Sequence, residues 1–253
     1  MSFDGFDDEF CWNEHQWEAH LNELEKRSEQ LRKFITADPK GSTPRWLTLL
    51  RENIDEHETV DAFIEEELLL DEAYFPEDED DWDEEDDFDD DDLFRLDDAF
   101  PNAEENDFDE GDEWKYLSDD YIHSEFGSIE SFELYNRTRR FAVDVLKWAE
   151  TVQERHHNKT YHEFVSEVLK IGAKIAGGYS FGFERDFLGG NIAYNKKALY
   201  CANNALKLLL RQRKYPYFEK NTYQGFHNRL FELRNDIGIY IQELRDQFNY
   251  GID

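Results

Sequence analysis

The side chains best suited to chemistry in this sequence are basic residues that gather beside tyrosines near the C-terminal end. The cluster comprises Lys207, Arg211, Arg213 and Lys214, followed by Tyr215 and Tyr217. Positive charge beside aromatic rings suits phosphates and stacked bases. Positions 196, 207, 211 and 214 fall on one side of a straight helix. The alternative is a solvated helix end whose cations are favoured by the helix dipole.

A second basic group occurs in the first turn of a predicted helix, where cations are electrostatically disfavoured. Its members are Arg137, Arg139 and Arg140. Because this position costs electrostatic energy, we interpret the group as an acid-binding site. With Lys196 and Lys197, the two groups form one predicted nucleic-acid-binding set: Arg137, Arg139, Arg140, Lys196, Lys197, Lys207, Arg211, Arg213 and Lys214.

Enzymatic and metal-dependent chemistry have little support in the sequence. His156, His157 and His162 lie near a predicted loop without a carboxylate at supporting spacing, so we expect a solvated loop and no metal. Arg234-Asn235-Asp236 resembles the start of the R-x4–6-H motif of HEPN-type helical ribonucleases, but positions 239–241 hold no histidine. Without that general acid or base, cleavage is not expected. We therefore predict neither a catalytic residue nor a cofactor, and expect Arg234 to pair with an acid on a neighbouring helix.

The charge of the chain divides sharply between its two halves. The 253 residues carry a formal net charge of −33, made of −37 in residues 1–128 and +4 in residues 129–253. Such asymmetry indicates an acidic interaction segment joined to a separate domain. Cys11 and Cys201 have no disulfide or metal spacing. No apolar run is long enough to span a membrane, and the acidic N-terminus lacks signal-peptide features, so we expect a cytoplasmic protein without membrane contact.

The elements that must position these residues are helical. Apolar residues recur at helical spacing over residues 10–37, and again to about residue 72 after Pro44. The pattern predicts an N-terminal helical hairpin, residues 1–72. This hairpin is too small to bury much core alone, so it needs the other domain or another protein as a partner surface.

Residues 73–128 form a predicted disordered, acidic-aromatic linker. Between Pro76 and Glu113, 23 of 38 residues are acidic and one is basic, and such charge density opposes collapse. Aromatic residues recur through it at steps of six or eight, as expected for exposed partner-binding rings kept in solution by charge. They are Trp82, Phe88, Phe94, Phe100, Phe108 and Trp114. The alternative is a solvated linker with incidental aromatics.

Residues 129–253 predict an up-down-up-down four-helix bundle. Four helical patterns cover residues 131–154, 160–178, 186–213 and 219–248, joined by short loops. We expect the second helix to end at Gly177-Gly178, where a left-handed residue is tolerated. Gly189-Gly190 is interpreted as a close-packing or kinked site. The predicted fold class is therefore all-α.

Two motifs in this bundle resemble a known family. Residues 170–178 read K-I-G-A-K-I-A-G-G, similar to the signature S-I-P-A-N-I-A-E-G, and the residues Asp186-Phe187-Leu188 with Ile192-Ala193 are similar to F-L-x-x-x-x-I-A. Both signatures belong to the four-helix-bundle proteins that include those encoded in ribosomal-RNA intervening sequences and the accessory protein of diversity-generating retroelements. This chain differs at Lys174 and Gly177, where the signature has Asn and Glu, and has Asn195-Lys196 where Gly-Ser follows Ile-Ala.

The resemblance covers the C-terminal half alone. It implies a non-enzymatic bundle that forms ring-like homo-oligomers, often pentamers, and, in the retroelement branch, binds nucleic acid. From the whole sequence we expect an oligomeric scaffold or adaptor whose N-terminal half binds an unidentified protein partner. The alternative is an accessory protein that binds RNA or DNA through the basic bundle surface and is regulated by the acidic segment.

Overall fold

The computed structural model describes residues 12–35, 43–72 and 128–251. These residues form α-helices and two short 3-10 helices, without a strand among them, which confirms the all-α prediction. In chain order the elements are α1 (Glu14–Ile35), α2 (Arg45–Glu52), α3 (Glu56–Glu72), η2 (Ile129–Ser131), α5 (Glu133–Thr151), η3 (Glu154–His156), α6 (Lys159–Phe181), α7 (Arg185–Gln212) and α8 (Lys220–Tyr250).

The predicted second helix of the N-terminal region is two helices. Asn53 is extended and ends α2, and Asp55 then caps α3 by accepting the backbone N–H of Glu58 at 2.9 Å. The Glu58 carboxylate accepts the backbone N–H of Ile54 at 3.0 Å. Ile54 falls at helical spacing but is 90% exposed within the turn. The prediction of one continuous helix was therefore wrong, because the cap formed by Asp55 and Glu58 begins a new helix.

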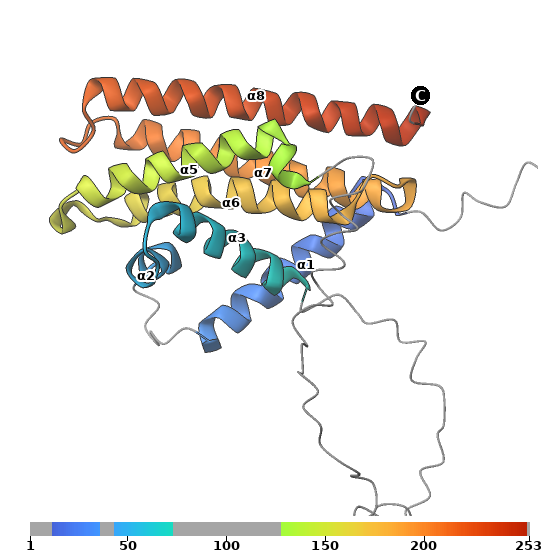
Figure 1. Ribbon diagram of the computed structural model, residues 1–253, viewed down its shortest axis with the longest axis horizontal. Coiled ribbons are helices and arrows are strands. Elements are labelled where there is room, and N and C mark those ends of the chain that lie inside the picture. The colour runs from blue at the N-terminus through green and yellow to red at the C-terminus, as the bar shows by residue number, and fades with distance from the viewer. Residues whose placement is uncertain (1–11, 36–42, 73–127, 252–253) are drawn as a thin grey trace, which may run out of the picture. The chain divides into compact units, whose positions relative to one another are not determined.

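Helices α5 to α8 form the predicted bundle (Figure 1). Successive helices run in opposite directions and are joined by short connections. The predicted end of the second helix at residues 177–178 was wrong: α6 continues to Phe181 and ends before Gly182, whose φ is 90°. Gly177 serves close packing instead, since a Cβ there would lie 2.7 Å from the Tyr194 ring on α7. The interpretation of Gly189 as a close-packing site is confirmed, because a Cβ at this position would lie 2.5 Å from the backbone oxygen of Trp12.

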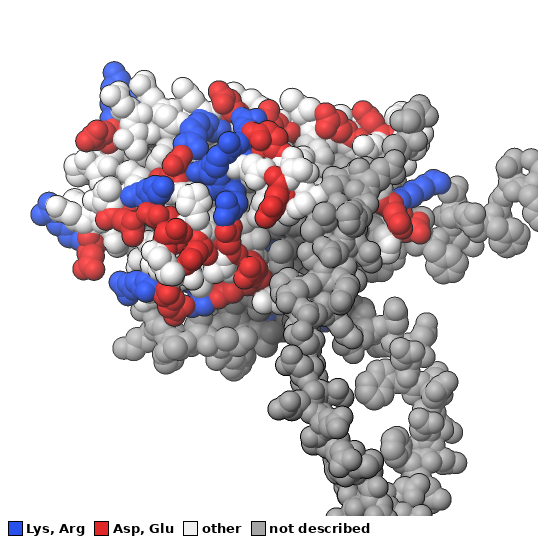
Figure 2. Space-filling model, in the orientation of Figure 1, with Lys and Arg blue, Asp and Glu red and all other residues white. Residues whose placement is uncertain are grey.

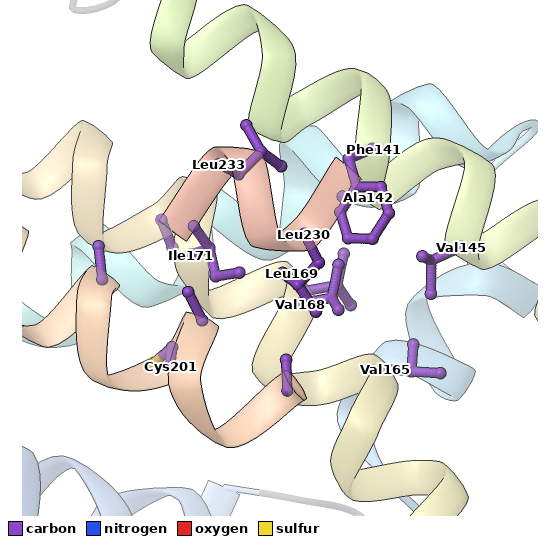
Figure 3. Close-up of a cluster of buried hydrophobic side chains, with 14 of the residues drawn as sticks. Phe141, Ala142, Val145, Val165, Val168, Leu169, Ile171, Cys201, Leu230 and Leu233 are labelled. Carbon is purple, nitrogen blue, oxygen red and sulfur yellow. The ribbon is translucent and has the colours of Figure 1, made fainter. Parts of the chain in front are cut away.

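Helices α1, α2 and α3 form a layer on the bundle, called here the N-terminal layer. Helix α1 contacts α7, and α3 contacts α5 and α6. Trp46 of α2 and Phe63 of α3 are buried in the same hydrophobic core as the bundle, whose centre is shown in Figure 3. The two chain segments separated by residues 73–127 therefore share one core.

Apolar burial within the bundle is dense along all four helices. Figure 3 shows the Phe141 ring of α5 directed toward Leu169 of α6, which lies beside Leu230 of α8. Val145 of α5 is directed toward Val165 of α6. Among the described helices, none is long and apolar enough to cross a membrane.

Candidate anion-binding surface

The structure divides the predicted nucleic-acid-binding set into paired and unpaired cations. Five of its members form ion pairs with acidic side chains: Arg137, Arg139, Arg140, Lys196 and Lys197. The other four are exposed and form no ion pair with any residue in the described ranges: Lys207, Arg211, Arg213 and Lys214. In this structure the set therefore does not present one open cationic surface, because the first five charges lie beside carboxylates.

The acids that offset three of these cations come from the N-terminal layer. The Lys196 ammonium lies beside Glu18 and, at 3.7 Å, beside Glu14. Lys197 is 2.8 Å from Glu25 of α1. On the other side of the layer, α3 contributes Asp61, which accepts a hydrogen bond from Arg139 Nε at 2.6 Å. The charge asymmetry between the two halves is thus partly used for internal docking.

A buried lysine joins this docking interface. Lys174 of α6 is only 4% exposed and lies 3.4 Å from Glu25 and 3.8 Å from Glu67. Its ammonium also lies 5.7 Å from the centre of the Tyr194 ring. Burial disfavours ionisation of Glu25, but Lys174 and Lys197 outweigh burial and hold the pKa of Glu25 below its usual value. The sequence marked Lys174 as a departure from a motif but gave no signal of its partners, which lie on other helices.

The four unpaired cations lie where α7 ends and α8 begins, and we call this region, residues 207–220, the α7–α8 corner. The Tyr215 and Tyr217 rings are stacked with centroids 5.3 Å apart and planes 11° from parallel. Arg213 lies over the Tyr223 ring at 5.6 Å. Residues 201–220 contain five basic residues and one acid, Glu219. The corner therefore combines unoffset positive charge with a partly exposed aromatic stack, the two components of a single-strand binding surface.

The remaining members of the set face a groove between α5 and α8. Its volume is about 480 Å³, and Arg137, Arg140, Lys147 and Arg229 line it together with Asp144. Figure 2 shows Lys and Arg gathered on this face with acidic side chains around them. Arginine and acid are paired here, since Arg229 Nη1 donates to Asp144 at 2.6 Å. Sequence reasoning missed Lys147, which the spacing 137, 140, 144, 147 on one helix face could have found, and Arg229, which comes from another helix.

The histidines near residue 157 and the Cys201 thiol pack against other side chains of the fold. The His157 ring stacks on Tyr161 with centroids 4.7 Å apart. Burial lowers the pKa of His162. No group of three potential metal ligands occurs among the residues that the structure describes. Burial raises the pKa of the Cys201 thiol to about 12, so this thiol is not an activated nucleophile.

Arg234 has an amide partner on the neighbouring helix. Its Nε donates to Asn203 Oδ1 of α7 at 3.2 Å, and Nη1 donates to Asn235 Oδ1 at 2.9 Å. The prediction that Arg234 pairs with an acidic residue was wrong, because the residue that faces it from α7 is Asn203. These contacts give the arginine a structural position between α7 and α8.

The predicted partner-binding aromatics lie outside the described residues, as does the acidic segment that contains them. They are Trp82, Phe88, Phe94, Phe100, Phe108 and Trp114. Comparison of the chain with protein-family models, curated proteins and solved structures finds no significant match. The function must therefore be argued from the described surface and the sequence.

Proposed function

We propose that this protein is a non-enzymatic binding protein that holds single-stranded nucleic acid at the α7–α8 corner. The observation that carries the proposal is the contrast between the two sets of cations. Those near the N-terminal layer are offset by carboxylates, whereas Lys207, Arg211 and Lys214 are exposed without an acidic partner among the described residues. Phosphates can bind to these exposed cations without displacing a protein carboxylate.

The aromatic stack supports single-stranded over double-stranded nucleic acid as the ligand. Tyr215 is 43% exposed and is supported from behind by Tyr217, so an unpaired base has a rigid ring on which to stack. Stacking of this kind contributes about 1–3 kcal/mol per base and tolerates any sequence. Bases within a duplex are already stacked on one another and cannot use the ring in this way.

Fluorescence anisotropy with labelled single-stranded RNA and DNA tests the proposal on the full chain. Four phosphate contacts at the corner give a slope of log affinity against log salt of about −2.8, since each single-strand contact contributes about −0.7. Between about 50 and 200 mM salt, this slope lowers the affinity about 50-fold. The combined substitution of Lys207→Ala, Arg211→Ala and Lys214→Ala is expected to reduce the slope to about −0.7.

The matched control removes three exposed basic residues elsewhere. Lys26, Arg27 and Arg51 are exposed on α1 and α2 and form no ion pair with a described residue. Their replacement by alanine changes the net charge of the protein equally but leaves the corner intact. Equal losses of affinity in the two triple variants would contradict a site at the corner, because they would indicate a dependence on net charge alone.

A second function, that of an oligomeric adaptor, has separate support. The segments flanking the acidic linker belong to one compact unit, so the linker is attached to the scaffold at both ends. On α8, Phe231 and Ile239 are about half exposed, which suits contact with another copy of the chain. Light scattering of wild-type protein and a Phe231→Ser variant tests self-association.

Deletion of residues 76–113 tests both recruitment of a partner and competition of this segment with nucleic acid at the corner.

A further inference from the structure

We infer that α1 is an internal competitor that covers a second, N-terminal part of the nucleic-acid-binding surface. The inference rests on the proposed function of the α7–α8 corner and adds a means of regulating it. When α1 leaves the bundle, the cations beneath it extend the corner along α7. The state with α1 docked therefore binds nucleic acid more weakly than the state with α1 released.

The two cationic regions lie on the same side of α7. Lys196 and Lys207 are 11 residues apart, which brings them within about 20° of each other around an α-helix. Lys207 is exposed, whereas the Lys196 side chain is only 21% exposed beneath α1. Arg211 follows Lys207 by one turn on the same side. The helix thus carries a row of cations of which one half is open and the other half is covered.

The cover is a row of carboxylates with matching spacing. Glu14, Glu18 and Glu25 are separated by four and seven residues, so they project from one side of α1. Arg245 Nε and Nη2 of α8 donate to Glu14 at 2.8 and 2.9 Å, and Glu18 and Glu25 contact Lys196 and Lys197. A row of carboxylates on adjacent lysines and an arginine occupies the positions that successive phosphates would take.

Helix α1 can leave without opening the main core. Among the α1 side chains that the structure describes, Leu21 and Leu24 are buried in a small cluster with Ala193 and Tyr194 of α7. The partly buried Trp17 of α1 and Phe181 of α6 pack against this cluster, which is separate from the core shared by α2, α3 and the bundle. Figure 1 shows α1 crossing the bundle obliquely, so it covers only part of α7. This cluster is smaller than the core shared by α2, α3 and the bundle, and a smaller apolar contact opens at a lower free energy than the core.

The proposed competition predicts how binding responds when the carboxylates are neutralised. Combining Glu14→Gln, Glu18→Gln and Glu25→Gln removes the charges that hold α1 on Lys196, Lys197 and Arg245. The same variant removes the Glu25 charge that lies beside the buried Lys174. Because apparent affinity scales with the fraction of competent molecules, a tenfold weaker docking equilibrium raises affinity by up to about tenfold. Exposure of three further cations makes the salt slope steeper by about 2.

The experiment combines anisotropy with hydrogen exchange on the full chain. Exchange of the α1 amides reports docking, and binding of labelled single-stranded RNA reports the surface. The control triple variant replaces Glu23, Glu154 and Glu243 by Gln; all three are exposed and form no ion pair with a described residue, so it changes net charge equally. Faster α1 exchange with tighter binding and a steeper salt slope, absent from the control variant, supports the inference.

Three outcomes overturn it. The first is faster α1 exchange with RNA binding no tighter than that of the control variant. The second is α1 exchange that stays unchanged in the Gln variant, which would mean that the carboxylates do not hold the helix. Both leave the proposed corner function intact if wild-type protein binds RNA with the expected salt slope. The third is absence of binding by wild type and every variant, which overturns the corner function as well.

Discussion

Replacement of Trp46 by alanine tests whether the N-terminal layer and the bundle fold as one unit. Trp46 is 1% exposed, and its ring lies 6.1 Å from that of Tyr161 on α6. Removal of a buried tryptophan costs about 3–5 kcal/mol in lost transfer free energy and cavity formation. The total stability of a domain is about 5–15 kcal/mol, so the loss is large and easily measured.

The assay is urea unfolding followed by the helical circular dichroism signal. With a slope of about 3 kcal/mol per molar urea, the substitution lowers the midpoint by about 1–1.7 M in a single transition. The control is Trp12→Ala, because Trp12 is 43% exposed and its loss is expected to cost less than about 1 kcal/mol. If Trp46→Ala instead produced a separate early transition and left the main midpoint unchanged, the layer would be an independent hairpin and the shared core would be refuted.

Two further predictions concern packing and pH. Gly177→Ala is expected to lower the melting temperature, because overpacking against the Tyr194 ring costs about 1–3 kcal/mol, whereas Gly238→Ala, with open space at its Cβ, raises it by gaining about 0.5–1 kcal/mol of helix propensity. Opposite shifts in calorimetry confirm the pair, and equal shifts contradict it. Hydrogen bonding from Arg245 lowers the pKa of Glu14, and the pKa of Glu25 is also lowered. Since both folded-state values lie below the ordinary 4.5, their contribution to docking is present above that pH and is lost as the pH falls through the lowered values. The protection factors of the α1 amides, which are exchange rates relative to the intrinsic rate at the same pH, should therefore fall at acid pH in wild type, and the Gln variant should not show this dependence.

The helices of the bundle were predictable because their apolar periodicity is strong and their connections are short. The wrong predictions concerned helix ends, where the same residue type is compatible with two different local structures. Ile54 continued the apolar spacing although it lies in a turn, and Gly177-Gly178 has the composition of a helix end although it permits close packing. Composition alone does not distinguish a glycine needed for backbone conformation from one needed for space.

The charged surface was less predictable than the fold. The sequence identified the basic residues but not which of them are offset, because their partners are remote. Lys196 and Glu18 are separated by 178 positions, and their contact exists only because α1 packs on α7. The net charge of each half indicated that the acidic half is a separate segment. In the structure, however, carboxylates of α1 and α3 form ion pairs with lysine and arginine side chains of the bundle.

The shared core has a consequence for the connectivity of the chain. Residues up to Glu72 and residues from Ile129 belong to the same compact unit, and the buried side chains of α2 and α3 complete the core of α5 to α8. The peptide bonds between these segments are therefore not what holds them together. A chain cut once within residues 76–113 is expected to remain a single particle under native conditions, and two separately produced fragments should restore it on mixing. The protein is in this sense a natural candidate for fragment complementation, in which recovery of the helical melting transition reports the reunion of the two pieces.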